Sequence, residues 1–260
     1  MVIQDGGPPI AVSYNDGGLL GHYYLVKVRL DSGSRVEPYL GAVQSGSATN
    51  CLGSGYNYFQ FRAKNVADSI NSSTEIASAR VVVSGSFHNG SSNENLPASL
   101  VPQKIRGKIE TFGADCVNSY QGSLRMLEIR PSEGRSCIEP FYLTKFQSTT
   151  IALNVIVGLH PDYDKRASSA VGRNFVCVKD SSGGGYKTII FLVIDAMKSA
   201  SVKSILTGLG CDANLMIQLD GALCLNYLKR LVLLGRAELR TAVRCRRCSP
   251  FLILIRAFIL

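Results

Sequence analysis

Residues 209–221 read Leu-Gly-Cys-Asp-Ala-Asn-Leu-Met-Ile-Gln-Leu-Asp-Gly, and together with the segment before them they decide the fold. An unbroken apolar run inside residues 186–195 predicts a buried strand. Apolar residues then recur through 199–209 at the spacing of one helix face, and residues 215–219 predict a second strand. Such a strand-helix-strand unit is predicted to pair its two strands parallel through a right-handed crossover.

Asp220 and Gly221 follow the second predicted strand directly. Open sheets that contain parallel strands tend to hold their ligands at the C-terminal ends of those strands. An Asp-Gly pair after a strand is by itself more often a turn than a site. Asp220 therefore becomes a candidate site residue only through its wider context.

The composition is that of a folded globular chain. Its 260 residues are 46% hydrophobic and only 18% charged, unlike the polar and highly charged composition of disordered segments. Residues 1–20 are rich in Gly, Pro, Asn and Asp and predict a loose lead-in. Residues 22–30 alternate apolar and polar side chains like a half-exposed strand, with residues 36–43 as the predicted hairpin partner. We expect one α+β domain with a mixed, mostly antiparallel sheet and few helices.

Several of these segments resemble the C-terminal half of the phosphodiester glycosidase family. The resemblance includes Val-Gly-Arg-Asn-Phe-Val-Cys-Val at 171–178, a glycine turn at 181–185, and Gln-Leu-Asp-Gly at 218–221. The usual family pattern is Gly-Arg-Thr-Phe-Ile-Gly-Val, a strand, a helix, and Leu-Asp-Gly-Gly-Gly-Ser. With weaker matches upstream, the resemblance covers most of residues 21–221, which we take as the phosphodiester glycosidase-like domain.

The resemblance implies a hydrolase site built around Asp220 and Arg173. Cleavage at a sugar's anomeric carbon needs a carboxylate near that carbon, because the transition state resembles an oxocarbenium ion. A guanidinium fits phosphate oxygens bidentately, which suits Arg173. Without the resemblance, Asp220 is a turn former and Arg173 an exposed residue that begins a strand. The same resemblance implies substrate-binding roles for Gly221 and for a loop near residue 85, where Ser84 and His88 replace the family's Asn and second Phe: Ser84, Gly85, Phe87 and His88.

Cysteine and histidine usage predicts neither a metal site nor a cofactor. The eight cysteines are too few for a disulfide scaffold in a chain of this length, and those before residue 220 have no zinc-like spacing. They are expected to be small buried hydrophobes or free thiols. The three histidines form no metal-binding pair with one another or with a cysteine.

The net charge of +9 belongs to one end of the chain. Residues 222–260 hold eight Lys or Arg and one acid, a charge of +7, which leaves +2 for residues 1–221. This distribution argues against a nucleic-acid partner. Three interpretations of the 222–260 tail compete: a frame-shifted or mis-joined coding end, a basic amphipathic helix for an anionic membrane, or a zinc site at Cys245 and Cys248. We favour the first, so we expect no membrane contact through the tail, and we expect residues 223–260 not to complete the sheet.

The leading functional expectation is a hydrolase that cleaves a sugar 1-phosphodiester, such as N-acetylglucosamine 1-phosphodiester, and that is impaired by the altered tail. After Gly221 the chain continues Ala-Leu-Cys, where the family has further Gly and Ser. The alternative is a non-catalytic glycan-binding or structural relative of the same fold. No signal peptide pattern is visible at residues 1–7; family members are often extracytoplasmic, and the compartment stays open.

Overall fold

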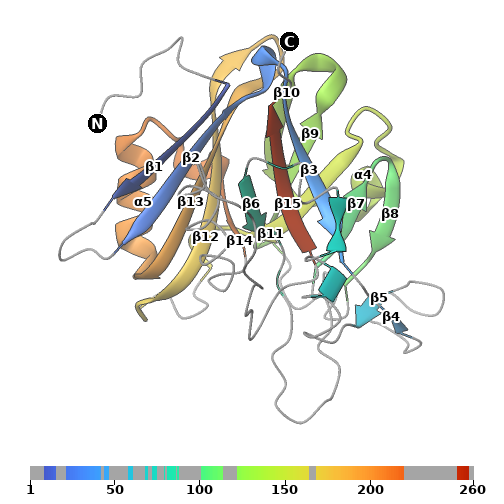
Figure 1. Cartoon of the computed structure of the whole chain (residues 1–260), viewed down its shortest axis with the longest axis horizontal. Coiled ribbons are helices and arrows are strands. Elements are labelled where there is room, and N and C mark those ends of the chain that lie inside the picture. The colour runs from blue at the N-terminus through green and yellow to red at the C-terminus, as the bar shows by residue number, and fades with distance from the viewer. Residues whose placement is uncertain are drawn as a thin grey trace.

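Apolar strands of the chain pair into antiparallel sheets in the computed structural model (Figure 1). The structure describes residues 9–15, 22–41, 44–46, 58–60, 68–69, 72–74, 79, 81–85, 87, 101–113, 122–163, 168–219 and 251–257. In this part of the chain antiparallel sheet dominates, α4 (Leu143–Ser148) and α5 (Ser199–Gly208) are its continuous α-helices, and residues 68, 69, 72 and 74 are also helical. The expected α+β class with a mostly antiparallel sheet and few helices is confirmed.

Ten strands form the main sheet: β1 (Ile10–Asn15), β2 (Tyr23–Arg29), β7 (Gln103–Ile105), β8 (Lys108–Thr111), β9 (Leu124–Arg130), β10 (Arg135–Pro140), β11 (Asn154–Leu159), β12 (Val171–Ser182), β13 (Gly185–Met197) and β14 (Met216–Leu219). A three-stranded sheet holds β3 (Ser34–Leu40), β15 (Phe251–Ala257) and β6 (Val81–Ser84) in that order. β4 (Gln44–Gly46) and β5 (Tyr58–Gln60) form a third pair. Short 3₁₀ turns occur at η2 (Leu30–Ser32), η3 (Pro131–Glu133) and η4 (Ala213–Leu215).

Six strands of the main sheet close into a ring. The order runs β13-β10-β9-β11-β14-β12, and β12 pairs again with β13. The β12–β13 ladder extends from Val171 and Met197 to Ser182 and Gly185, whereas one registered pair joins β10 to β13 and one joins β11 to β14. The ring therefore contains one long hairpin, and two of its strand pairs, β10–β13 and β11–β14, have a single registered residue pair each.

The β12–β13 hairpin turns on two glycines, as the glycine turn in the sequence predicted. Gly183 and Gly184 have φ of 51° and 88°. A two-residue turn with positive φ at both positions matches the right-handed twist of the strands, and glycine adopts it without strain.

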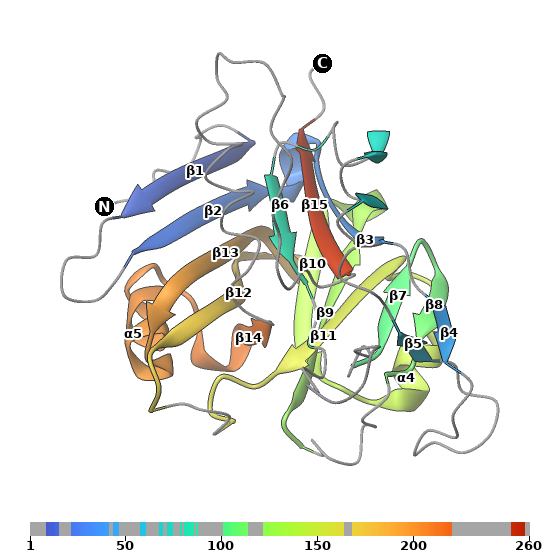
Figure 2. The same cartoon turned by 60° about the horizontal axis from the view of Figure 1, so that its bottom comes forward.

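The three-stranded sheet lies against one face of the main sheet, and α5 lies against the other (Figures 1 and 2). Alternate residues of β12 and β13 serve the two faces, since side chains of a strand alternate. Val176 and Phe191 join the core with Ile253 and Ile255 of β15, whereas Phe175 and Leu192 join the core with Val202 and Leu206 of α5. A third apolar cluster lies under α4 and contains Phe146 with residues of β9 and β11.

The strand-helix-strand unit exists, but its strands are not neighbours. β13, α5 and β14 match the predicted segments closely. β12 lies between the two strands and is antiparallel to both. β13 and β14 therefore run in the same direction without pairing, because the hairpin partner of β13 occupies the edge that a parallel neighbour would need.

The predicted hairpin of residues 22–30 with 36–43 is wrong. β1 and β13 occupy the two edges of β2, so β3 joins β15 in the other sheet. The lead-in also contains a strand, since Ile10–Asn15 forms β1 along Tyr23–Val28. Its apolar start at 10–12 was obscured by the surrounding Gly and Pro residues.

The expectation that residues 223–260 form no well-paired strand is wrong for residues 251–257, although these residues pair in the three-stranded sheet and not beside β14. Residues 251–257 form β15, the central strand between β3 and β6, with Ile253, Leu254 and Ile255 at most 1% exposed. The single charge within the strand, Arg256, lies near its end, 3.3 Å from the carboxylate of Glu37. The rest of the tail, residues 222–250 and 258–260, lies outside the described residues, as do Cys245 and Cys248.

Candidate functional site

Three strand ends and a helix start lie together at one end of the main sheet. We use edge here for the place where these strands begin or end, and not for the lateral side of the sheet. Because β12 is antiparallel to β13 and β14, its first residues lie beside the last residues of both. α5 begins at Ser199, two residues after β13 ends at Met197. We term this region, residues 171–174, 197–199 and 218–219, the β12–β14 edge.

Arg173 is buried at this edge. Its side chain is 3% exposed, and it is paired in register with Ile194 of β13. A guanidinium withdrawn from water is strongly unfavourable without polar or charged partners. Arg173 is therefore not the exposed residue at the start of a strand that is expected without the family resemblance.

Asp220 and Gly221 lie outside the described residues, so the predicted cleft shared by Asp220 and Arg173 stays a prediction. The chain is described up to Leu219, which is buried and paired with Asn174, the residue after Arg173. The structure therefore establishes that β14 ends one register position from Arg173.

Gly158 of β11 permits the close approach of β14. A Cβ at this position would lie 3.0 Å or less from the side chains of Ile217 and Leu219 and from the Gln218 carbonyl oxygen. Real Cβ atoms do not tolerate such contacts with backbone. A glycine is needed here, and it sets the position of the strand that leads to Asp220.

Other buried polar residues lie on the same strand ends and helix start as Arg173. Asn174, Ser199 and Gln218 are 2–3% exposed. The Ser199 hydroxyl and Gln218 Oε1 have no hydrogen-bond partner in the part of the chain that the structure describes. Buried polar atoms of this kind are uncommon in folded proteins and often mark places where water or a ligand binds.

The start of α5 adds positive potential to the same edge. The residue before the helix, Lys198, makes no side-chain capping hydrogen bond. The first N–H groups of a helix lack intrahelical partners and carry the positive end of its dipole. The N–H groups at the start of α5 and the Arg173 guanidinium are together chemically suited to bind an anion.

The upstream candidates lie elsewhere. Gly85 is buried beyond the end of β6, and Phe87 is 7% exposed in the apolar cluster with Leu124, Val157 and Leu159. That cluster does not include Arg173. His88 and the side chain of Ser84 lie outside the described residues. Phe87 thus packs against β9 and β11, as a core side chain does.

Sequence reasoning missed a group of charged residues beside α4, which we term the α4 ion cluster: Glu128, Arg130, Glu139 and Lys145. Arg130 Nη2 donates to Glu128 Oε2 at 2.8 Å, while Lys145 pairs with Glu139 and lies 3.7 Å from Glu128 Oε1. Burial raises the pKa of Glu139, Lys145 lowers it, and the neighbouring Glu128 carboxyl raises it further. Two cations balance two carboxyl groups, so the cluster ties α4 to β9 and β10.

Cys177 and Cys211 form a disulfide, which corrects the expectation of free thiols for this pair. Both are buried against α5, at 0% and 4% exposure. Among the described cysteines, Cys137 is free. The 34-residue separation gave no signal, because the two positions meet only once α5 packs on β12.

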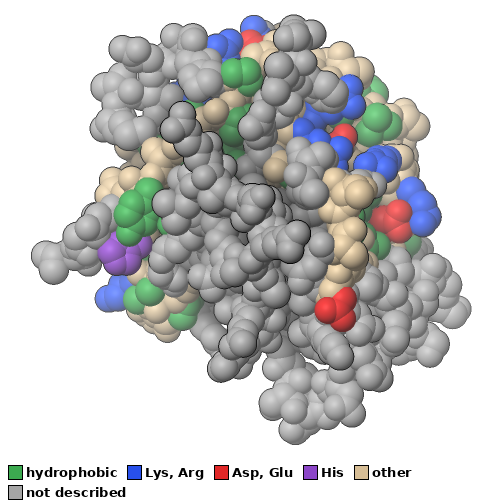
Figure 3. All heavy atoms as spheres, viewed as in Figure 1, with side chains coloured by type: hydrophobic (Ala, Val, Ile, Leu, Met, Phe, Trp, Pro, Cys, Tyr) green, Lys and Arg blue, Asp and Glu red, His purple; other side chains and the backbone are tan. Residues whose placement is uncertain are grey.

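On the face in Figure 3, Lys and Arg side chains gather toward one side and lie beside acidic ones. No group of His, Cys, Asp and Glu within the described residues could hold a metal ion. Within the same residues, no helix is long and apolar enough to cross a membrane.

Comparison with known proteins gives no family assignment: no protein-family model matches the chain, and no curated protein matches it.

Proposed function

We propose that this protein is a phosphodiester glycosidase-like hydrolase of the class that cleaves a sugar 1-phosphodiester, such as one of N-acetylglucosamine, and that its activity is impaired by the residues after Gly221. The observation that carries the proposal is the position of Arg173, buried one register position from the end of β14. The antiparallel register, continued by one residue, would set Asp220 opposite Arg173. A carboxylate and a guanidinium would then flank one substrate.

In the proposed reaction the bond between the anomeric carbon and the phosphodiester oxygen breaks. The Asp220 carboxylate stabilises positive charge as it develops on the anomeric carbon. Water adds to that carbon and loses a proton, giving the free sugar and a phosphate monoester. The phosphate leaves as an anion and therefore needs little protonation.

The β12–β14 edge supports the phosphate part of the proposal. Arg173 offers a planar pair of donors that match two phosphate oxygens. The uncapped start of α5 and the Ser199 hydroxyl provide further donors at the same edge. Helix N-termini commonly bind phosphate for this reason.

A second candidate is a non-catalytic glycan-binding relative of the same fold. The sequence after Asp220-Gly221 favours it, because Ala222, Leu223 and Cys224 replace small Gly and Ser residues. Side chains at these positions would occupy space that substrate and backbone donors need. The two candidates differ in turnover and not in sugar recognition.

Activity of a restored loop distinguishes the two candidates. The chain as given should release little or no sugar from N-acetylglucosamine 1-phosphodiester. The triple substitution Ala222→Gly, Leu223→Gly and Cys224→Ser should restore release, since it returns small residues beside Asp220 and leaves β15 in place. Adding Asp220→Asn to the triple variant should then lower kcat by a factor of about 10²–10³, the usual effect of removing one preorganised electrostatic group.

Two further variants locate the phosphate contact. Arg173→Lys in the triple variant keeps a charge but loses the bidentate geometry, so KM should rise. Glu133→Gln removes a carboxylate on η3, outside the β12–β14 edge and 3.8 Å from Arg130 Nη1, and should change neither constant. If the triple variant is inactive but binds the sugar phosphodiester, the non-catalytic candidate replaces the proposal. Full activity after Asp220→Asn would remove Asp220 from the mechanism.

A further inference from the structure

The C-terminal turn of α5 returns the chain onto β12. Gly210 has φ of 86°, its N–H bonds to the Thr207 carbonyl at 2.9 Å, and the N–H of Cys211 bonds to the Leu206 carbonyl at 3.0 Å. These two bonds define a Schellman motif, and the apolar contact that accompanies it is made by Cys211 and Leu206 in one core cluster. The motif points Cys211 at the sheet.

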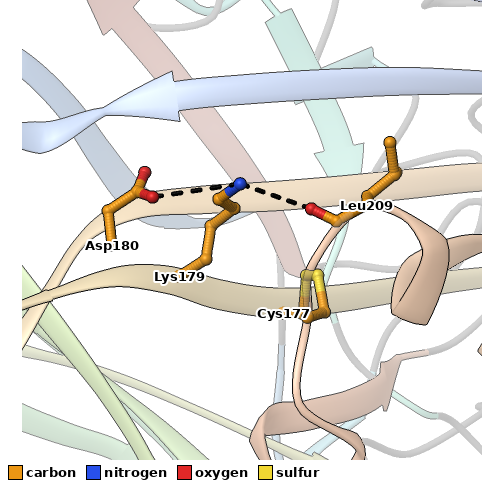
Figure 4. Close-up of a disulfide and its surroundings, with 5 residues drawn as sticks. Cys177, Lys179, Asp180 and Leu209 are labelled. Carbon is orange, nitrogen blue, oxygen red and sulfur yellow. Dashed lines mark hydrogen bonds and ion pairs between the residues drawn. A yellow bond between two sulfur atoms is a disulfide. The ribbon is translucent and has the colours of Figure 1, made fainter. Parts of the chain in front are cut away.

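β12 holds this turn at two points, as Figure 4 shows. Cys177 is bonded to Cys211, with their Cα atoms 6.1 Å apart. Two residues along the strand and on the same face, Lys179 donates from Nζ to the Leu209 carbonyl at 3.3 Å and lies 3.9 Å from Asp180. The covalent contact lies inside the core, and the charged contact lies nearer solvent.

The other contacts of α5 include apolar packing of its buried face and an ion pair between Lys203 and Asp162. The buried side chains of the helix are Ser199, Val202 and Leu206. A ten-residue helix is marginal in water on its own, so its order depends on its attachment to the sheet. By contrast, the long β12–β13 ladder and the β9–β10 hairpin are held by continuous backbone pairing.

We infer that the Cys177–Cys211 bond and Lys179 form a redox-dependent clamp that holds α5 and its connection to β14 on the sheet. With the clamp closed, the segment from Ser199 to Leu215 is fixed. Reduction opens this segment as a unit and leaves the remaining sheet folded. The inference does not depend on the proposed enzymatic activity.

The opening reaction is a two-electron exchange with a dithiol. One thiolate of the dithiol attacks the Sγ of Cys211, the less buried of the two residues, and Cys177 leaves as a thiolate that takes up a proton. The second thiol of the dithiol then attacks the mixed disulfide and releases Cys211 as a thiol. The dithiol becomes a disulfide, and the protein gains two thiols. Because both cysteines are nearly inaccessible, the reaction requires a transient local fluctuation that exposes the bond to the dithiol.

Hydrogen exchange of the full chain before and after dithiothreitol tests the clamp, with peptide mapping to verify which thiols are released. After reduction and alkylation, amides within residues 203–211 should exchange at least roughly ten-fold faster, while amides within 124–140 should not change. Cys137→Ser provides a matched control, since it removes a free thiol and should leave both regions as in the unmodified chain.

Substitution of Lys179 separates the two points of the clamp. In the oxidised chain, Lys179→Met should speed exchange at Leu209, Gly210 and Cys211, and Lys179→Arg should restore protection. Faster exchange across the whole sheet after reduction would overturn the inference and make the bond a global staple. Unchanged exchange at 203–211, or free thiols at Cys177 and Cys211 before reduction, would also overturn it. If Cys177→Ala with Cys211→Ala fails to fold, the reduced and alkylated chain still provides the comparison.

Discussion

At the scale of single residues, Gly158 decides how closely two strands pack. Its alanine variant would force a Cβ against the Gln218 carbonyl, which is backbone and cannot rotate away. We expect Gly158→Ala to lower the free energy of unfolding by about 1–3 kcal/mol, as overpacking usually does. Urea denaturation of the purified chain measures the change.

Gly208→Ala is the matched control for that prediction. A Cβ at Gly208, within α5, meets no atom within 4 Å. Alanine is favoured over glycine in a helix by about 1 kcal/mol, so this variant should be as stable as the original chain or more stable. Equal stability of Gly158→Ala and Gly208→Ala would show that β11 and β14 lie farther apart than described.

Glu139 makes a pH-dependent contribution whose sign follows from its raised pKa. A carboxyl group that binds its proton more tightly when folded destabilises the folded state while it is ionised. This penalty is fully present above the folded pKa and disappears as pH falls to the ordinary value near 4.5. Glu139→Gln should therefore be most favourable relative to the original chain near pH 8 and least favourable near pH 5. Thermal unfolding at the two pH values measures this, and a difference that does not vary with pH would contradict the assignment.

At the scale of elements, the same local unit occurs twice with different outcomes. β2–η2–β3 and β9–η3–β10 each contain an Arg, a 3₁₀ turn, and a glycine in the left-handed region, Gly33 and Gly134. β9 and β10 pair as a hairpin, whereas β2 and β3 enter different sheets. Local sequence thus determines the turn, and competition for strand edges determines the pairing.

The two contacts of the α5 clamp differ in strength. Closing a loop of 34 residues by a disulfide stabilises a fold by roughly 4 kcal/mol in the chain-entropy model. A hydrogen bond from a charged donor contributes about 1.5–3 kcal/mol, and less when the donor is partly exposed as Lys179 is. The covalent contact therefore dominates, and Lys179 refines the position of the turn.

At the scale of the whole molecule, β15 joins the last described residues to β3 and β6, strands from the first third of the chain. Ile255 pairs with Val36 and Val81 and is fully buried. Ile255→Ala should lower the free energy of unfolding by about 2–5 kcal/mol through lost burial and a cavity. Ile151→Ala makes the same change at a side chain that is 56% exposed, and should stay within about 0.5 kcal/mol of the original chain. Equal urea midpoints for the two variants would contradict the pairing and burial of β15 between β3 and β6.

Local sequence patterns predicted the elements that form mainly through local contacts. The sequence alone predicted β13 from its apolar run, α5 from its helical spacing, and the turn between β12 and β13 from its glycines. The neighbours of β2, the place of β15 and the Cys177–Cys211 bond were not, because each depends on contacts between distant segments. At the candidate site, the resemblance pointed to Arg173, and the structure adds its burial and its distance of one register position from the end of β14. Phe87 lies in the core beside β9 and β11, which no local pattern distinguishes from a binding residue.

The central position of β15 also dictates an order of events during synthesis. Among the described strands, β3 pairs with β15 alone, and residues 41–250 separate the two. A nascent chain that has not reached residue 251 lacks the strand with which both β3 and β6 pair. Pairings of such long sequence separation form slowly and leave strand edges exposed in the meantime. The ribosome must therefore deliver β15 before the three-stranded sheet can form, so chaperones that shield free strand edges should influence the yield of this protein most during that interval.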